Sequence, residues 1–346
     1  PLVALGDRPQ VVAVLVSSLT RVQSLGKALA VRAMRRAGAG DFAGARADVL
    51  AAHRLARHVG SGPLLIDRLV GMSLERQAAK AGAALAASGA LPAGPARRFV
   101  RDLRTLGPLP GVAEAVDRAE RFVMLDNAQT FARGQAFTPG GQEMGPLQRL
   151  EGAVVRGHDW DAVLRHLNAT YDNYAAALRE RTHAARQWAC RRAWRNVEHL
   201  MAMTGIKPGK THWMVLIQQV LASPLSSPGK IAAALLSLGT SRLGQMDGLH
   251  TRAVMRRELA TLAFALAAHK ARTGEYPASL SALAPSPLPA VPTDRFTGEP
   301  LHYERTDEGG YRLYSVGMNA RDDGGVWDLD ADPAKDDLGV EAPAAG

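Results

Sequence analysis

The sequence predicts a mainly helical protein, in which a multi-helix, repeat-like antiparallel helical body is followed by a small α+β domain with an antiparallel hairpin. Apolar residues make up 47% of the chain and aromatic residues only 5%, a balance that favours packed helices over sheet. Apolar positions recur at spacings of three and four along most of the chain, and alternation with a period of two appears only near residues 301–314. A length of 346 residues favours two domains.

Residues 11–88 predict antiparallel helices. The first ends at Gly38-Ala39-Gly40, Asp41 caps the second, and Pro63 suits the first turn of a third. With a Gly-Asp turn and small residues at Ala33, Ala45 and Ala52, residues 26–59 resemble one tetratricopeptide-type hairpin, which we interpret as a repeat-like hairpin and not an array.

The middle of the chain predicts further helices and one long loop. The loop is the Gly/Pro-rich segment 134–146, a possible subdivision of the helical body. We expect helices over residues 92–106, 108–133, 159–203 (as one long helix) and 213–221, and another that starts near residue 231.

The C-terminal stretch has the clearest local signals. Met255, Leu259, Leu262 and Leu266 mark one face of a helix, and Gly274 supplies its C-terminal cap. A Pro-rich extended segment follows. Two alternating strands then flank residues 306–310, a five-residue hairpin loop with two glycines.

Four segments of this stretch resemble the C-terminal domain of the major pseudopilins of type II secretion, over about residues 255–338. They are Tyr276-Pro-Ala-Ser-Leu280, Leu288-Pro-Ala-Val-Pro-Thr-Asp294, Tyr314-Ser-Val-Gly317 and Asp322-Asp-Gly-Gly325. The resemblance implies a helix packed on a small antiparallel sheet, and a loop that binds calcium. Some 250 residues precede the match, so the chain resembles a pseudopilin head on another domain rather than a fibre subunit.

The loop after the hairpin is rich in oxygen ligands, which calcium prefers. By the resemblance, Asn319 occupies a position that an aspartate ligand usually holds. The alternative is a solvated acidic tail. The expected calcium ligands are Asn319, Asp322, Asp323, Asp328, Asp330 and Asp337.

A second candidate site lies in the arginine-rich half of the predicted helix 159–203. Arginines interleaved with tryptophans suit nucleic acid or an anionic surface, although long side chains also cover the apolar face of a solvated helix. The residues are Arg186, Trp188, Arg191, Arg192, Trp194 and Arg195.

No pattern in the sequence predicts catalysis, and we do not expect an enzyme. We interpret Cys190 as a small core residue and Asp159, beside His158, as a helix cap. Asp117 and Glu120 are expected to pair with neighbouring arginines, Arg118 or Arg121.

These observations predict a helical domain over residues 1–245, a pseudopilin-like domain over 246–338 and a disordered tail over 339–346. The expected function is a non-catalytic extracytoplasmic interaction or scaffold protein, periplasmic or otherwise outside the cytoplasm, of a secretion or pilus-like system. Its partners would be proteins, with membrane association through an N-terminal anchor upstream of the given residues. The alternative is a cytoplasmic helical module that binds nucleic acid or an anionic surface. The net charge of +9 permits either surface, and we rank nucleic acid below protein partners.

Overall fold

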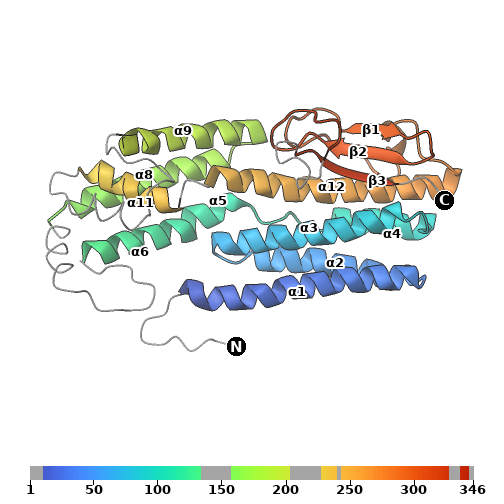
Figure 1. The fold of residues 1–346 in the computed structure, drawn as a ribbon, viewed down its shortest axis with the longest axis horizontal. Coiled ribbons are helices and arrows are strands. Elements are labelled where there is room, and N and C mark those ends of the chain that lie inside the picture. Colours follow the sequence, from blue (N-terminus) through green and yellow to red (C-terminus); the bar gives the residue numbers. More distant parts are fainter. Residues whose placement is uncertain (1–10, 134–156, 203–226, 240–242, 327–335, 343–346) are drawn as a thin grey trace. The chain divides into compact units, whose positions relative to one another are not determined.

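A computed structural model describes residues 11–133, 157–202, 227–239, 243–326 and 336–342. It confirms a mainly helical chain with a small antiparallel sheet near the C-terminus (Figure 1). The chain divides into two compact units. The first comprises residues 1–62, 66–110 and 249–346, and the second comprises residues 63–65 and 111–248.

The first unit contains α1 to α4, most of α12, and the sheet. Its helices are α1 (Val11–Gly38), α2 (Phe42–Gly60), α3 (Leu65–Ala87), α4 (Ala93–Thr105) and α12 (Leu243–Thr273), which begins in the second unit. The turn between α1 and α2 forms as predicted. Gly40 adopts a φ of 79°, which glycine tolerates at no steric cost, and the Asp41 carboxylate accepts the Gly44 backbone N–H at 2.8 Å.

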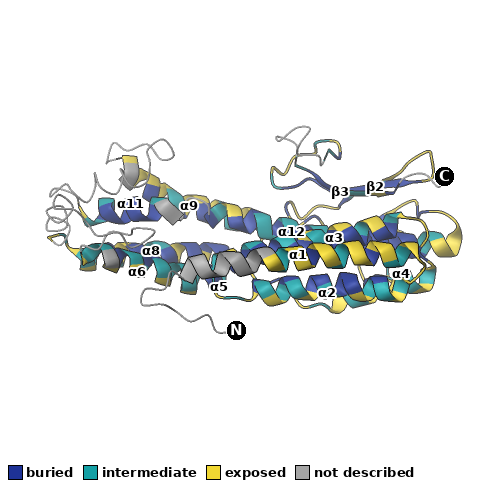
Figure 2. Cartoon of the chain, turned by 60° about the horizontal axis from the view of Figure 1, so that its bottom comes forward, coloured by how far each residue is buried: buried dark blue, intermediate teal, exposed yellow. Residues whose placement is uncertain are grey.

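Small residues let α1 and α2 pack closely. Ala33 and Ala45 are fully buried, and Ala52 is 1% exposed, as the predicted hairpin requires. Figure 2 shows the buried residues of α2, α3 and α12 as dark faces, while residues 21–38 of α1 are largely exposed.

One hydrophobic core joins the helices to the sheet within this unit. Leu259, Leu262 and Leu266 of α12 contribute to it, together with Phe99 of α4 and Leu313 of the sheet. Phe99 stacks on Phe264 with ring centroids 4.1 Å apart. The predicted apolar face of α12 is thus confirmed, but its partners include helices more than 150 residues earlier in the chain.

This shared core differs from the domain division that the sequence suggested. We expected residues 1–245 to form one helical domain, whereas α1 to α4 belong to the same compact unit as the sheet. The physical reason is that α12 needs apolar partners around its circumference, and the four N-terminal helices supply part of them. The predicted loop at 134–146 lies outside the described residues.

The sheet has three antiparallel strands in the order β1-β2-β3. They are β1 (His302–Arg305), β2 (Tyr311–Ser315) and β3 (Leu338–Ala342). Pairing of Arg305 with Tyr311 places the hairpin loop at residues 306–310 as predicted, with Gly309 at a φ of 77°.

The third strand corrects the prediction of a disordered tail from residue 339, because β3 pairs with β2 through Ala342. Leu338 and Ala342 are buried in the common core. At the end of α12, the Gly274 N–H donates to the Lys270 carbonyl at 2.8 Å, and Gly274 has a φ of 92°, as its predicted role as a cap requires. The Pro-rich segment after α12 contains a short 3₁₀ turn, η3 (Leu280–Leu283).

The second unit is helical over its described residues. It contains α5 (Val112–Ala115), the π-helical turn η1 (Val116–Glu120), α6 (Arg121–Ala132), α8 (Trp160–Leu178), α9 (His183–Ala202) and α11 (Pro228–Gly239). The predicted long helix over 159–203 is wrong, because the chain breaks after α8 and α9 packs back against it. Thr182 starts α9 by accepting the Ala185 N–H at 3.1 Å. Neither Gly nor Pro marks this break.

Candidate functional site

The most buried ionic group of the first unit surrounds Glu75 of α3. Its carboxylate is fully buried and lies 2.9 Å from Nδ1 of His53. It also accepts hydrogen bonds from the Arg57 guanidinium at 3.0 and 3.3 Å. Nε of Arg257, from α12, lies 3.9 Å away. We call these four residues the Glu75 cluster.

The charged partners in this cluster determine whether the Glu75 carboxylate is ionised. Burial alone would raise the pKa of Glu75, but the charges and hydrogen bonds of His53 and Arg57 outweigh it and lower the pKa from 4.5 to about 2. Glu75 is therefore ionised at neutral pH. The sequence analysis missed this cluster. The available signal was a spacing of four between His53 and Arg57, on the face of α2 that also contains Val49 and Ala56.

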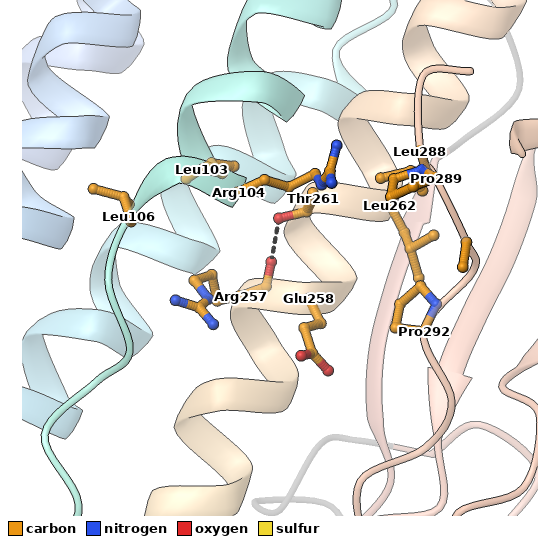
Figure 3. Close-up of a pocket in the computed structure, with 11 residues that line it drawn as sticks. Leu103, Arg104, Leu106, Arg257, Glu258, Thr261, Leu262, Leu288, Pro289 and Pro292 are labelled. Carbon is orange, nitrogen blue, oxygen red and sulfur yellow. Dashed lines mark hydrogen bonds between the residues drawn. The ribbon is translucent and has the colours of Figure 1, made fainter. Parts of the chain in front are cut away.

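A pocket of about 240 Å³ opens beside Arg257, between α4, α12 and the Pro-rich segment (Figure 3). We call it the α4–α12 pocket. Arg104 reaches from α4 toward Thr261 of α12, while Leu288 and Pro292 line the opposite wall. The Thr261 hydroxyl donates to the Arg257 carbonyl at 2.8 Å, so this polar group is already occupied.

The charged groups of the pocket are not balanced. Glu258 is held by Arg295, whose Nε lies 2.9 and 3.0 Å from its two carboxylate oxygens. Burial lowers the pKa of Arg257, and the attraction of Glu75 opposes that effect. Arg104 has no hydrogen-bond or ion-pair partner among the residues that the structure describes. Arg104 and Arg257 both line the pocket, and its one carboxylate, that of Glu258, is already paired.

The acidic loop of the head brings together four of the six predicted calcium ligands. Asp337 accepts the Gly325 N–H at 2.8 Å and the Asp323 N–H at 3.2 Å. Asp323 accepts the Asn319 side-chain amide at 2.8 Å, and Asp322 accepts the Gly324 N–H at 2.9 Å. Hydrogen bonds from amide N–H groups to these carboxylates close the loop.

Crowding of these carboxylates has an electrostatic consequence. Burial raises the pKa of Asp337, and the negative charges of Asp323 and Asp322 raise it further. Within the described part of the chain, no group of three or more His, Cys, Asp or Glu residues has the arrangement of a metal site. Asp328 and Asp330 lie outside that part.

Asp336 is a loop residue that the predicted ligand set omitted. It accepts the Met318 N–H at 3.0 Å and forms an ion pair with Arg252 of α12 at 2.6 Å. Asp294 was also missed as a structural residue. It accepts the backbone N–H groups of Phe296 at 2.8 Å and Val316 at 2.9 Å, and so ties the Pro-rich segment to the end of β2.

The six residues of the predicted anionic-surface site divide into two groups on α9. Arg186 forms an ion pair with Asp247, and the Trp194 indole donates to Glu198 at 2.7 Å. Both side chains therefore have intramolecular partners.

The other group faces solvent. Trp188 is 55% exposed, and the Arg192 guanidinium lies 5.5 Å from its ring centroid. Arg191 and Arg195 are also exposed. For these three arginines, the described residues provide no carboxylate partner.

Several other titratable groups of the second unit have structural partners or are buried. His183 Nδ1 lies 2.7 Å from Asp247. Cys190 is 3% exposed, and burial raises its pKa to about 11, so it is a protonated core thiol. Asp159 caps α8 through the Ala162 N–H at 2.9 Å, as predicted. Asp117 pairs with Arg121 at 2.6 Å, also as predicted.

Glu120 differs from its expected pairing with an arginine. Its carboxylate accepts the Leu65 N–H at 3.0 Å.

Comparison with protein-family models, with curated protein sequences and with solved structures returned no match for this chain. Among its described helices, none combines the length and apolar character needed to cross a bilayer.

Proposed function

We propose that this chain is a non-catalytic interaction or scaffold protein that works outside the cytoplasm, in a secretion or pilus-like system. The observation that carries the proposal is the head. A long helix, α12, shares a core with a three-stranded antiparallel sheet, the arrangement that the resemblance to pseudopilin heads implies.

The residues behind that resemblance have structural roles that fit such a head. Tyr276 is 3% exposed and packs edge-on against Tyr311 with ring centroids 4.8 Å apart. The Tyr303 hydroxyl donates to the Pro277 carbonyl at 2.8 Å. Asp294, before the hairpin, accepts the backbone N–H of Val316, after it, at 2.9 Å. These contacts support a rigid head that presents loops to a partner.

A non-catalytic role is part of the proposal because the clusters of titratable residues have structural roles. The Glu75 cluster is an internal ion network. In the second unit, His183 and Asp247 form a buried pair, and Arg186 also forms an ion pair with Asp247. Cys190 is a buried thiol with a raised pKa, which disfavours the thiolate that a nucleophile requires.

Calcium binding by the acidic loop belongs to the same proposal. Its support is the resemblance, together with the hydrogen bonds that link Asn319, Asp323 and Asp337 in one loop. Burial raises the pKa of Asp337, and the negative charges of Asp323 and Asp322 raise it further. A divalent cation would offset those charges, with Asp328 and Asp330 as its further expected ligands. Calcium would then rigidify the head without taking part in chemistry.

The calcium part is tested by thermal melting with 2 mM calcium, with a chelator, and with magnesium as the control ion. We expect calcium to raise the melting temperature of the parent and of Asp307→Asn, in the distant hairpin loop, but not of Asp323→Asn. A melting temperature that is the same in calcium and chelator removes calcium from the proposal.

Location outside the cytoplasm has its own test. In the native host, the complete gene product should be released with the periplasmic or surface fraction, or be digested by protease added to cells with a permeabilised outer membrane. Recovery only with the cytoplasmic marker, in protease-resistant form, would contradict the proposal.

The second candidate function is contact with nucleic acid or an anionic surface through α9. The observation that favours it is the exposed set of Trp188, Arg191, Arg192 and Arg195. Phosphate neutralisation makes such binding fall steeply with salt. A triple Arg→Gln variant at 191, 192 and 195 should abolish retention on DNA or anionic vesicles at low salt. No retention of the parent protein on either support would end this alternative.

A further inference from the structure

The α4–α12 pocket has the composition of a ligand site rather than of a packing defect. Leu103, Leu106, Leu262, Leu288 and the ring of Pro292 belong to its wall, and the side chains of Arg104 and Arg257 lie at separate places along it (Figure 3). Ligand pockets typically combine apolar walls with a few convergent polar groups. Every lining residue belongs to the first unit, so the site lies inside one compact body.

The charge of the pocket selects an anion. Glu258 is already neutralised by Arg295 through two short contacts, so it does not balance the other cations. Arg257 shares Glu75 with Arg57 and His53, and its distance of 3.9 Å from Glu75 makes it the most distant of the three partners. Arg104 has no described partner. Arg257 also donates to the Gly107 carbonyl at 3.5 Å, so the open cation of the pocket is Arg104.

Size and wall composition then restrict the anion. A volume of about 240 Å³ equals the space of roughly eight water molecules, at about 30 Å³ each. That space matches a molecule of roughly ten non-hydrogen atoms. Bare phosphate or sulfate would leave the leucine and proline walls in contact with water, so a ligand that matches the pocket has an apolar body.

We propose that the α4–α12 pocket binds a small monocarboxylate with an apolar body, aromatic or branched aliphatic. Its carboxylate pairs with Arg104, and its body packs against Leu288 and Pro292. Arginine suits this role because its planar guanidinium matches carboxylate geometry. The site is independent of the proposed partner binding and of the acidic loop.

The test uses titration calorimetry with benzoate as the probe, on the whole chain at low salt. Benzamide has the same shape without the charge, and inorganic phosphate has charge without the apolar body. We expect saturable binding of benzoate with a Kd of roughly 1 mM, as for a ligand of this size. Benzamide and phosphate should each bind at least about tenfold more weakly, since both the charge-assisted bond and the apolar contact are required.

Two variants place the binding in this pocket. Arg104→Ala removes one guanidinium and should weaken benzoate binding by about tenfold. Arg98→Ala, on the same helix with the same charge change, should bind as the parent does. Ala290→Phe adds bulk at the pocket wall without changing charge, and should also weaken benzoate binding.

Melting curves of the three variants identify any loss of fold. If Arg104→Ala is unstable, Ala290→Phe still tests whether benzoate binds in this pocket. Equal binding of benzoate and benzamide, equal effects of the variants at residues 98 and 104, or no heat of binding at 10 mM benzoate would overturn the proposal.

Discussion

Replacing Glu75 by glutamine tests the buried ionic network directly. The substitution keeps the size of the side chain but removes its charge, so Arg57 and Arg257 lose their common counter-ion inside the first unit. The Glu75 pKa falls from 4.5 to about 2 on folding, which corresponds to about 3 kcal/mol at neutral pH, at about 1.4 kcal/mol per pKa unit. Removal of one member of a buried ion pair has a similar cost, about 3–5 kcal/mol.

The dependence of this contribution on pH follows from the sign of the shift. In the unfolded chain Glu75 takes up a proton near pH 4.5, whereas in the folded chain it stays ionised down to about pH 2. Its stabilisation is therefore complete above about pH 4.5 and is lost as the pH falls toward 2. The parent and Glu75→Gln should differ most at neutral pH and converge within that acid range.

The assay is urea unfolding followed by circular dichroism, with hydrogen exchange of α2 and α3 peptides to assign the transition to the first unit. The control is Glu275→Gln. Glu275 pairs with Arg305 at 3.1 Å but is 76% exposed, so its loss should leave the midpoint within error. Equal stability of Glu75→Gln and the parent at pH 7, or a gap that persists unchanged to pH 2, would refute the reasoning.

Three further substitutions test the packing of the first unit. Gly71→Ala should destabilise it by about 1–3 kcal/mol, because the new methyl group would lie 2.8 Å from the Gly60 backbone. Thermal melting checks this prediction, and an unchanged melting temperature would show that α2 and α3 can move apart. Phe99→Ala should cost about 3–5 kcal/mol in urea unfolding, since the ring stacks on Phe264 at 4.1 Å; a loss below 1 kcal/mol would contradict the core described. Asp294→Ala leaves two buried backbone N–H groups unpaired and should cost about 1–3 kcal/mol, with faster hydrogen exchange at the end of β2; unchanged exchange there would rule out that role.

Local signals in the sequence were sufficient to predict those features in which a single residue determines the backbone conformation. Gly40 and Gly274 end helices with positive φ, and the glycines of the hairpin loop close it between paired strands. The face of α12 was equally predictable from its spacing, because a buried helix needs an apolar stripe with that period. Such features depend on neighbours within a few residues.

Features that depend on distant partners were not predictable. The break between α8 and α9 contains no Gly or Pro, and only the capping hydroxyl of Thr182 marks it. Strand β3 follows a long acidic loop, and its pairing with β2 cannot be inferred from so short a segment. The four N-terminal helices share a core with the head, and a hydrophobic period does not specify which helices pack together.

The candidate sites also differ in whether neighbouring residues in the sequence or distant residues form them. The acidic loop and the exposed side of α9 are local in sequence, and the residue types alone indicated them. The Glu75 cluster and the α4–α12 pocket assemble residues from three or more elements, so only the structure could bring Glu75 to Arg257 or Arg104 to Pro292. Arg186 shows the reverse, because its pairing with Asp247 withdraws it from a surface that the sequence had assigned to it.

We propose that the head binds a protein partner. Site-specific photocrosslinking in the native host tests it most directly, with the photoreactive residue placed at Glu304 or Asp307 of the head and at Arg192 or Arg195 of α9. We expect discrete protein adducts from the head positions, sensitive to protease and lost when the sheet is disrupted by Leu313→Asp. Adducts only from α9, sensitive to nuclease, or no protein adduct from either head position, would contradict it.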